Sequence, residues 1–376
     1  ADFVDMLKLR PSYGIGGNIG RNTAPYLIAS YYDSSLVDGM AGSVNTPPNK
    51  DIRWEKTTTV NVGVDFALFR HRLSGTIEYY NKYSVDLLAA INGSPTQGFG
   101  YTTLMTNNGK MVNRGVEITL SGEIIRQKDF SWNASLLYAF NRNKVKHISV
   151  QPSLWDSRIS MPTSYPMVGK PLYGIYAYKW AGLNENGDPQ VYDAENNVTS
   201  GPARDYHALV YCGTTVPIHN ASLTNVLRYK GFEFSAMLIL DAGHKLRSSN
   251  IPSINMSNGR ITSTAKGIVD RWTQPGDVTD VPRLLFSNDT ENFNTHRTEL
   301  YRYSDLFVYD ASNIRLSNIS LAYRVPAHWC KKISLSGARL QFNVENVATF
   351  AFDSKANYDL GGKVKPNYVW GLYLNF

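Results

Sequence analysis

The sequence predicts an all-β fold in which antiparallel strands form part of a transmembrane β-barrel. Apolar and polar side chains alternate with a period of two along most of the 376 residues, which is typical of strands. The gaps between the alternating segments are short and long in turn. No apolar run reaches the roughly 18 residues that a membrane helix needs, so this chain would cross a membrane only by strands.

The first half of the chain contains a clear series of alternating segments. In the range 57–69, Val60, Val62 and Val64 lie on one face, while Asn61 and Asp65 lie on the other. The same alternation recurs before and after this range. The predicted strands of this half are 4–13, 57–69, 73–83, 114–123 and 130–140.

The second half continues the pattern and brings the total to about ten strands. The predicted strands here are 221–229, 232–243, 313–325, 333–345 and the C-terminal segment 368–376. That last segment places its large apolar side chains on a single face, which makes it a membrane-facing or core-facing strand. These side chains are Tyr368, Trp370, Leu372, Leu374 and Phe376.

The gaps predict that all tight turns lie at one end of the strands and all long loops at the other. Outer-membrane barrels are built in this way, with short periplasmic turns and long extracellular loops. Strands of about 10 residues, tilted by about 40°, also span the apolar band of about 25 Å. The expected extracellular loops lie near 14–56, 84–113, 141–220, 244–312 and 346–366.

The polar half of each strand must face water. In a barrel it would line a wet lumen, and in a soluble sandwich it would face solvent, so alternation alone leaves both architectures open. Under the barrel hypothesis the candidates for the lumen wall are Asn61, Asp65, Glu117, Thr119, Asn343 and Glu345.

We find no catalytic, cofactor-binding or metal-ligating signature and do not expect an enzyme. The seven histidines are scattered without metal-ligand spacing, and two cysteines provide neither a disulfide framework nor a zinc site. The segment Asn184–Asp188 has oxygen ligands around Gly187, but a plain turn is favoured over a calcium loop. The net charge of +7 is spread along the chain, and we expect no nucleic-acid partner.

Aromatic residues are frequent in the expected long loops. Exposed rings could form stacking platforms for sugars or peptides, because a ring face provides contact area at a low entropic cost. Internal packing of the loops is the competing explanation and is favoured for any individual residue. The weak candidates for substrate contacts are Trp155, Tyr176 and Trp180.

Several motifs occur in a specific order. Residues Arg53–Thr57 followed by Asn61–Phe66 resemble the "E-x-T…N-x-G-x-D" strand of SusC/RagA-type TonB-dependent outer-membrane transporters. The terminal Phe376 on an aromatic strand resembles the signal that barrel-assembly machinery recognises. Further motifs in the order of that family are Tyr79–Lys82, Asn107–Glu117, Gly169–Tyr173, Arg271–Asp277 and Ile314–Tyr323.

The resemblance implies that the chain is the C-terminal part of such a transporter. It would supply roughly the last ten strands of a barrel of about 22, without the plug domain and the TonB box. The implied function is energy-coupled import of oligosaccharides or peptides through the outer membrane of a Gram-negative bacterium, with no cofactor. The implied partners are a SusD-like surface lipoprotein, TonB acting through the plug, and outer-membrane lipid.

Two other classes of protein stay open at this point. A passive outer-membrane porin or adhesin would share the strands and the sorted loops. A soluble β-sandwich that binds carbohydrate would share the alternation, but it would fold as a monomer without detergent.

Overall fold

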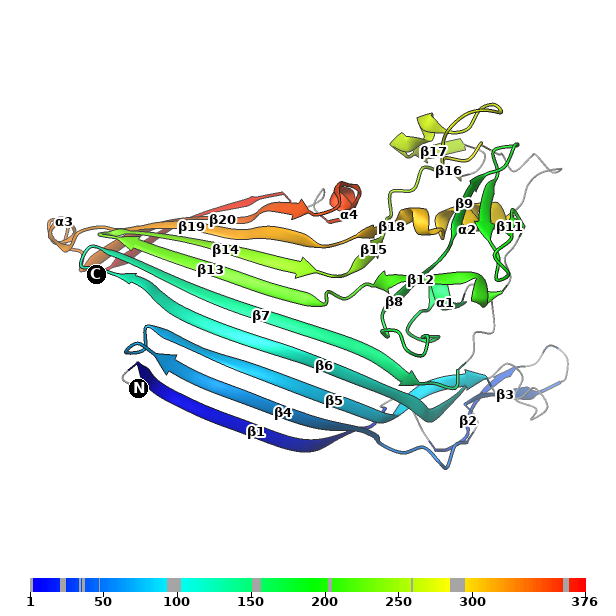
Figure 1. Cartoon of the computed structure of the whole chain (residues 1–376), viewed down its shortest axis with the longest axis horizontal. Coiled ribbons are helices and arrows are strands. Elements are labelled where there is room, and N and C mark those ends of the chain that lie inside the picture. Colours follow the sequence, from blue (N-terminus) through cyan, green and yellow to red (C-terminus); the bar gives the residue numbers. More distant parts are fainter. Residues whose placement is uncertain are drawn as a thin grey trace.

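A computed structural model describes residues 3–20, 25–33, 35, 38–46, 48–92, 103–150, 157–201, 205–257, 260–284, 295–360 and 365–376. The main element is a ten-stranded sheet in which every neighbouring pair is antiparallel and the spatial order follows the sequence (Figure 1). All the strands predicted from the alternation are present. They are β1 (Val4–Asn18), β4 (Glu55–Leu68), β5 (Leu73–Asn92), β6 (Thr103–Arg126), β7 (Phe130–His147), β13 (His219–Tyr229), β14 (Phe232–Ala242), β19 (Asn313–Arg324), β20 (Gly337–Ala351) and β21 (Asn367–Asn375).

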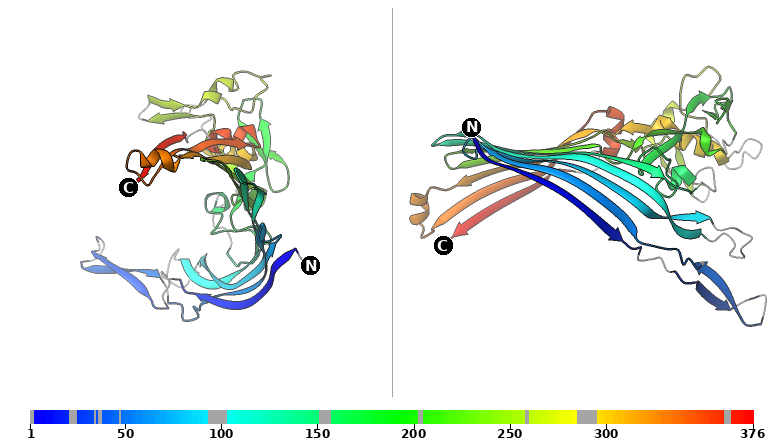
Figure 2. Two further views of the ribbon diagram at one scale, coloured as in Figure 1. Left: turned by 90° about the vertical axis from the view of Figure 1, so that its left-hand side faces the viewer. Right: turned by 60° about the horizontal axis from the view of Figure 1, so that its bottom comes forward.

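The sheet curves into an open arc (Figure 2). Its two edge strands are β1 and β21, each of which pairs on one side only within the described residues. The arc is therefore a portion of a barrel wall and not a closed barrel. Among the described residues, no helix has the length and apolar character to cross a membrane.

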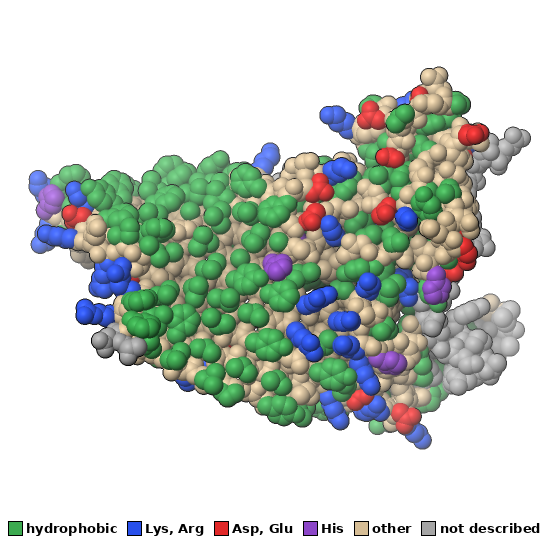
Figure 3. Space-filling view, in the orientation of Figure 1, with side chains coloured by type: hydrophobic (Ala, Val, Ile, Leu, Met, Phe, Trp, Pro, Cys, Tyr) green, Lys and Arg blue, Asp and Glu red, His purple; other side chains and the backbone are tan. Residues whose placement is uncertain are grey.

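The sheet has two chemically different faces. Because side chains alternate along each strand, the cross-strand register determines which residues share a face. One apolar row crosses the sheet through successive cross-strand partners, namely Val64, Ile77, Ile118, Tyr138, Ala221 and Leu240. Such rows form a broad apolar band (Figure 3), and they lie on the face of the sheet that is convex in Figure 2. The intervening rows lie on the concave face and are mostly polar, with Leu137, Met237 and Ile239 as exceptions.

A bulge in β19 keeps these faces consistent. Ser317 has no cross-strand partner. In the pairing of β19 with β14 and with β20, partners are found for Leu316 and Asn318 but not for the residue between them. The extra residue shifts the alternation by one position. As a result, Ile314 and Leu316 before the bulge lie on the same face as Ile319 after it.

The predicted loop at 84–113 is wrong in its extent. β5 and β6 continue to pair through this range, from Ser84 opposite Met111 to Asn92 opposite Thr103, with register shifts at Leu87. The alternation is lost here because the apolar side chains of β5 occupy consecutive positions from Leu87 to Ile91. The backbone ladder does not depend on alternation and continues.

Short turns and long excursions are sorted to opposite ends of the sheet (Figure 1). The turns after β4, β6, β13 and β19 lie at one end. The turn after β19 contains helix α3 (Ala327–Lys331). We call the opposite end the long-loop end. The paired elements there are β2 (Ile28–Asp33) with β3 (Met40–Thr46), β8 (Gly174–Tyr178) with β12 (Leu209–Thr214), β9 (Trp180–Leu183) with β10 (Pro189–Tyr192) and β11 (Val198–Thr199), β15 (Lys245–Arg247) with β18 (Val308–Asp310), and β16 (Ile254–Ser257) with β17 (Arg260–Thr264).

Short helices complete the long-loop end. They are α1 (Ser157–Ser160), α2 (Thr295–Arg302) and α4 (Asn357–Leu360), with 3₁₀ turns at Tyr206–Ala208, Lys266–Asp270, Asp305–Phe307 and Ser354–Ala356. A small cluster of buried hydrophobic residues lies here. It consists of the buried residues Tyr176, Tyr178, Val191, Ala208, Leu209 and Leu300. We refer to β8–β12 together with α1 and α2 as the loop module.

Candidate functional site

The concave face of the sheet is the candidate functional surface. All the residues that the sequence predicts for the lumen wall have register positions on this face. Glu117 and Thr119 lie opposite Glu78 and Thr76 of β5, which in turn lie opposite Gly63 and Asp65. Asn343 and Glu345 of β20 lie opposite Ser320 and Asn318 on the same face. Asn61 lies two residues from Gly63 and shares its orientation.

A depression of about 360 Å³ lies near the middle of this face. Two of the predicted residues, Glu117 and Thr119, line it from β6, and Asn220 and Asp241 line it from β13 and β14. The lining therefore offers two carboxylates, an amide and the hydroxyls of Thr119 and Ser222 to water or to a solute, beside the apolar side chains of Leu137 and Ile239. These groups can form hydrogen bonds with sugar hydroxyls and with peptide groups.

Ion pairs fix the charged side chains near the first strands. Arg10 of β1 donates hydrogen bonds to Asp65 at 2.6 Å and to Glu78 at 2.6 Å, so that it joins three strands. The Thr76 hydroxyl donates a further bond to Asp65 at 2.9 Å. The carboxylates of Asp65 and Glu78 are thereby held in place by partners on other strands.

A second network crosses the later strands. Glu233 of β14 accepts hydrogen bonds from Arg228 at 2.7 Å and from Arg339 at 3.1 Å. Asp241 accepts one from Arg315 at 2.9 Å and one from Asn220 at 2.7 Å. The concave face thus presents fixed charges of both signs, which suits a water-filled passage better than a packed core.

Sequence reasoning placed Asp65, Glu117 and Glu345 on this wall but missed the carboxylates of Glu78, Glu233 and Asp241 and the basic partners Arg10 and Arg339. Arg10 lies 55 positions from Asp65 along the chain. Only the register of β1 on β4 brings them together, and the sequence pattern carries no signal for that register.

The structure separates the predicted aromatic candidates. Tyr176 is 1% exposed and belongs to the core of the loop module, where its hydroxyl accepts a hydrogen bond from the Met167 N–H at 3.2 Å. Its ring therefore packs inside the loops and has no face for a ligand. Trp180 is half-buried, and its indole N–H donates to Asp280 at 2.9 Å. Trp155 lies outside the described residues.

The segment Asn184–Asp188 forms a turn, as favoured from the sequence. The Asn184 side-chain oxygen accepts hydrogen bonds from the N–H groups of Asn186 and Asp188, and Gly187 has a φ of 73°. Glycine adopts such a positive φ without a steric penalty. Among the described residues, no group of three or more histidine, cysteine, aspartate or glutamate side chains is placed to hold a metal ion.

Asp188 joins distant segments of the loop module through ion pairs with two arginines. It accepts hydrogen bonds from Arg297 of α2 at 2.6 Å and from Arg283 at 3.0 Å. Burial alone would raise the pKa of Asp188, but the two guanidinium groups outweigh burial and hold this pKa below its ordinary value. The folded loop module is therefore stabilised by the ionised form.

We expect acid to loosen the loop module through Asp188. Because the pKa is lower in the folded state, the stabilisation is complete above the unfolded pKa of about 3.9 and is lost as the pH falls through the lower folded value. The protection of the β9 and β10 amides from hydrogen exchange, measured relative to the intrinsic rate at each pH, should therefore fall in that pH range. At neutral pH, Asp188→Asn should weaken the module by about 1–3 kcal/mol.

The matched control for this prediction is Glu185→Gln, which changes an exposed carboxylate in the same turn. It should leave the exchange rates unchanged. Equal exchange in the wild type and Asp188→Asn at every pH would contradict the role assigned to Asp188.

Comparison with known proteins identifies the fold. A family model described as "TonB dependent receptor-like, beta-barrel" matches residues 2–347. The chain belongs to this family. Proteins of this family reside in the outer membrane of Gram-negative bacteria, so the convex apolar face of this family member is the one that meets lipid.

Individual relatives of this TonB-dependent receptor barrel confirm the resemblance to the SusC/RagA type. TonB-dependent receptor P3 of Formosa agariphila is 26% identical over 98% of the chain, and TonB-dependent receptor SusC of Bacteroides thetaiotaomicron is 26% identical over 90%. The structure of the RagAB peptide transporter superimposes over the whole chain with a TM-score of 0.77 at 23% identity, which shows the shared fold.

The chain spans only part of each of these proteins. It covers 38% of the length of the receptor P3, 34% of SusC and 41% of the RagAB transporter chain.

Proposed function

We propose that this chain forms part of the barrel wall of an energy-coupled outer-membrane importer of oligosaccharides or peptides. The observation that carries the proposal is the two-faced sheet, with an apolar convex face and a concave face of fixed charges and amides. A wall of this kind separates lipid from a wet lumen. The similarity to SusC and to the RagAB peptide transporter supports nutrient import as the function.

The long-loop end would face the cell exterior and contact a SusD-like surface lipoprotein. The hairpin β2–β3 supports this part of the proposal, because Tyr31 is 71% exposed and Met40 is 69% exposed. Tyrosine and methionine are enriched at protein–protein interfaces. TonB would act on the plug domain that the resemblance implies.

The full-length transporter in its own bacterium provides the test. Cells would receive a labelled oligosaccharide mixture or a labelled peptide mixture, and uptake would be compared in the wild type and in strains that lack the transporter, TonB or the neighbouring lipoprotein gene. We expect each deletion to abolish uptake of one of the two mixtures. The mixture that fails to enter identifies the substrate class.

Two outcomes would contradict the proposal. Uptake that persists without TonB would identify a passive porin. Recovery of the full-length protein as a soluble monomer without detergent would favour the sandwich class.

The matched site variant is Glu117→Gln, which should alter uptake, with Ser121→Ala on the same strand as its control.

A further inference from the structure

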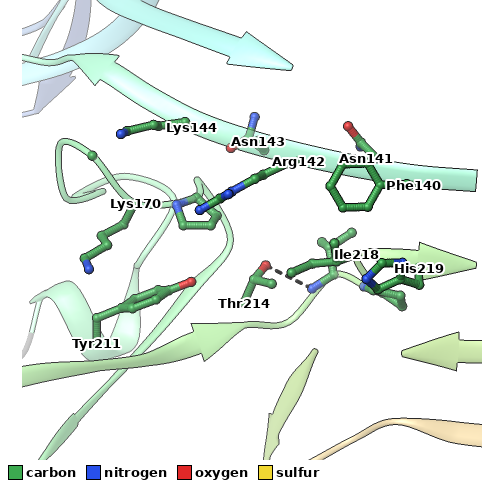
Figure 4. A pocket seen from close by; sticks show the side chains of 14 residues that line it. Phe140, Asn141, Arg142, Asn143, Lys144, Lys170, Tyr211, Thr214, Ile218 and His219 are labelled. Atoms are coloured by element: carbon green, nitrogen blue, oxygen red, sulfur yellow. Dashed lines mark hydrogen bonds between the residues drawn. The ribbon is translucent and has the colours of Figure 1, made fainter. Parts of the chain in front are cut away.

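A basic cavity lies where the apolar convex band ends on the side of the loops. It has a volume of about 420 Å³ and lies between β7, the segment before β8 and the segment before β13. Figure 4 shows Arg142 extending from β7 toward the loop that carries Lys170, with Lys144 farther along β7 and Lys170 over Tyr211. The Lys170 ammonium is 4.8 Å from the centre of the Tyr211 ring.

The position of the cavity follows from the register. Phe140, the last apolar residue of the band on β7, lies opposite Val116. The next residue on the same face of β7 is Arg142, and the next is Lys144. The basic side chains therefore start where the apolar band stops, and Figure 3 shows Lys and Arg gathered along this border.

The cavity carries positive charge without compensation. Its lining contains Arg142, Lys144 and Lys170, and none of the described lining residues is an aspartate or glutamate. In the part of the chain that the structure describes, none of these three side chains forms an ion pair with a carboxylate. This contrasts with the concave face, where Arg10, Arg315 and Arg339 all have carboxylate partners.

The register adds a second, independent sign of a missing anion. Arg142 lies directly opposite Arg114 of β6, so two guanidinium groups share the same face of adjacent strands. Like charges in this arrangement destabilise a sheet. Arg114 donates one hydrogen bond to the Asn81 side-chain oxygen at 3.1 Å, which does not neutralise it.

We propose that this cavity binds the phosphate group of an anionic lipid in the membrane leaflet at the long-loop end. Arginine and lysine recognise phosphate oxygens through charge-assisted hydrogen bonds. A lipid is the source that fits, because its acyl chains would lie along the apolar band below Phe140 while its phosphate reaches Arg142. A soluble phosphate would gain nothing from that band.

This inference goes beyond the proposed function and requires only that the convex face meets lipid. The lipid would act as a fixed part of the barrel surface. It would offset the repulsion between Arg114 and Arg142 and hold the loop that carries Lys170 against the sheet.

The experiment uses the full-length transporter in bilayer nanodiscs made of equal amounts of phosphatidylcholine and phosphatidylglycerol. After extraction, native mass spectrometry counts the lipids that stay bound. We expect phosphatidylglycerol to be enriched over phosphatidylcholine on the wild type. The variant Arg142→Gln with Lys144→Gln should reduce its affinity by about fivefold for each cation removed.

The matched control is Lys8→Gln, which removes a lysine from the concave face opposite Asp65 and should retain wild-type enrichment. Because Lys144 is exposed, the single variant Lys144→Gln should assemble normally. It can be used for the same measurement if the double variant does not assemble. No enrichment on the wild type, or equal enrichment on wild type and variant, would overturn the inference.

A further arm separates the sources of phosphate. Binding of inorganic phosphate to the detergent-solubilised wild type, with the same loss in the Arg142 and Lys144 variant and no lipid enrichment, would assign the cavity to a soluble anion and overturn the lipid. Nutrient uptake is measured in parallel. Lost lipid binding with normal uptake would leave the proposed function intact, and lost uptake in the TonB test with normal lipid binding would leave the lipid site intact.

Discussion

Leu223→Arg in the full-length transporter is expected to lower the free energy of unfolding from a bilayer by about 2–4 kcal/mol. Leu223 is near the middle of β13, on the convex apolar face between Leu136 and Leu238. An arginine there would be placed in the hydrocarbon of the bilayer, far from either interface. Denaturant titration of the protein refolded into phospholipid vesicles measures the effect.

The neighbouring residue provides the control. Thr224 lies on the concave face opposite Ser135 and Met237, so Thr224→Arg should change the same free energy little. If Leu223→Arg were tolerated while Thr224→Arg disrupted folding, the assignment of the two faces would be reversed. Equal tolerance of both would indicate that neither face meets lipid.

Tyr176→Ala is expected to destabilise the loop module by about 3–5 kcal/mol, because it removes a buried aromatic ring and leaves a cavity. The ring is 1% exposed and packs in the core with Tyr178 and Leu300. Tyr176→Phe retains the ring and loses only the hydrogen bond from Met167, so it should cost about 1 kcal/mol. Limited proteolysis across β8–β12 measures both variants.

Tyr173→Ala serves as the control, because Tyr173 is 50% exposed in the segment just before β8. It should leave proteolysis nearly unchanged. If Tyr176→Ala preserved protease resistance but weakened nutrient uptake, the ring would be a ligand surface after all, and its assignment to the core would fail.

The strands of the sheet could be predicted from the sequence because both faces of the sheet are chemically marked. Where the apolar–polar alternation stops, the extent of the strands was not predicted correctly. The ladder of β5 and β6 continues from Ser84 to Asn92 and from Thr103 to Met111, where the apolar side chains of Leu87–Ile91 occupy consecutive positions and therefore both faces. In β19, alternation identifies Ile319, Leu321 and Tyr323 as one face, but it does not assign Ile314 and Leu316 to the same face, because Ser317 shifts the period.

The site could be predicted only in part, for a related reason. Alternation is a local property, and it correctly places Asp65, Glu117 and Asn343 on the polar face. Ion pairs and burial depend on residues far apart in the sequence. The pairing of Arg10 with Asp65 and the burial of Tyr176 beside Leu300 of α2 both require contacts that no local pattern encodes.

The bulge at Ser317 bears on how such a wall can change during evolution. A single inserted residue would move every later side chain of a strand to the opposite face, so that side chains that met lipid would meet water and the reverse. In β19 the extra residue relative to β14 coincides with an irregularity in β20, where Asn346 and Val347 lie between the partners of Leu316 and Asn318. Surviving length changes in these strands should therefore come as pairs of residues, or as one residue absorbed by an outward kink, while the loops can vary freely.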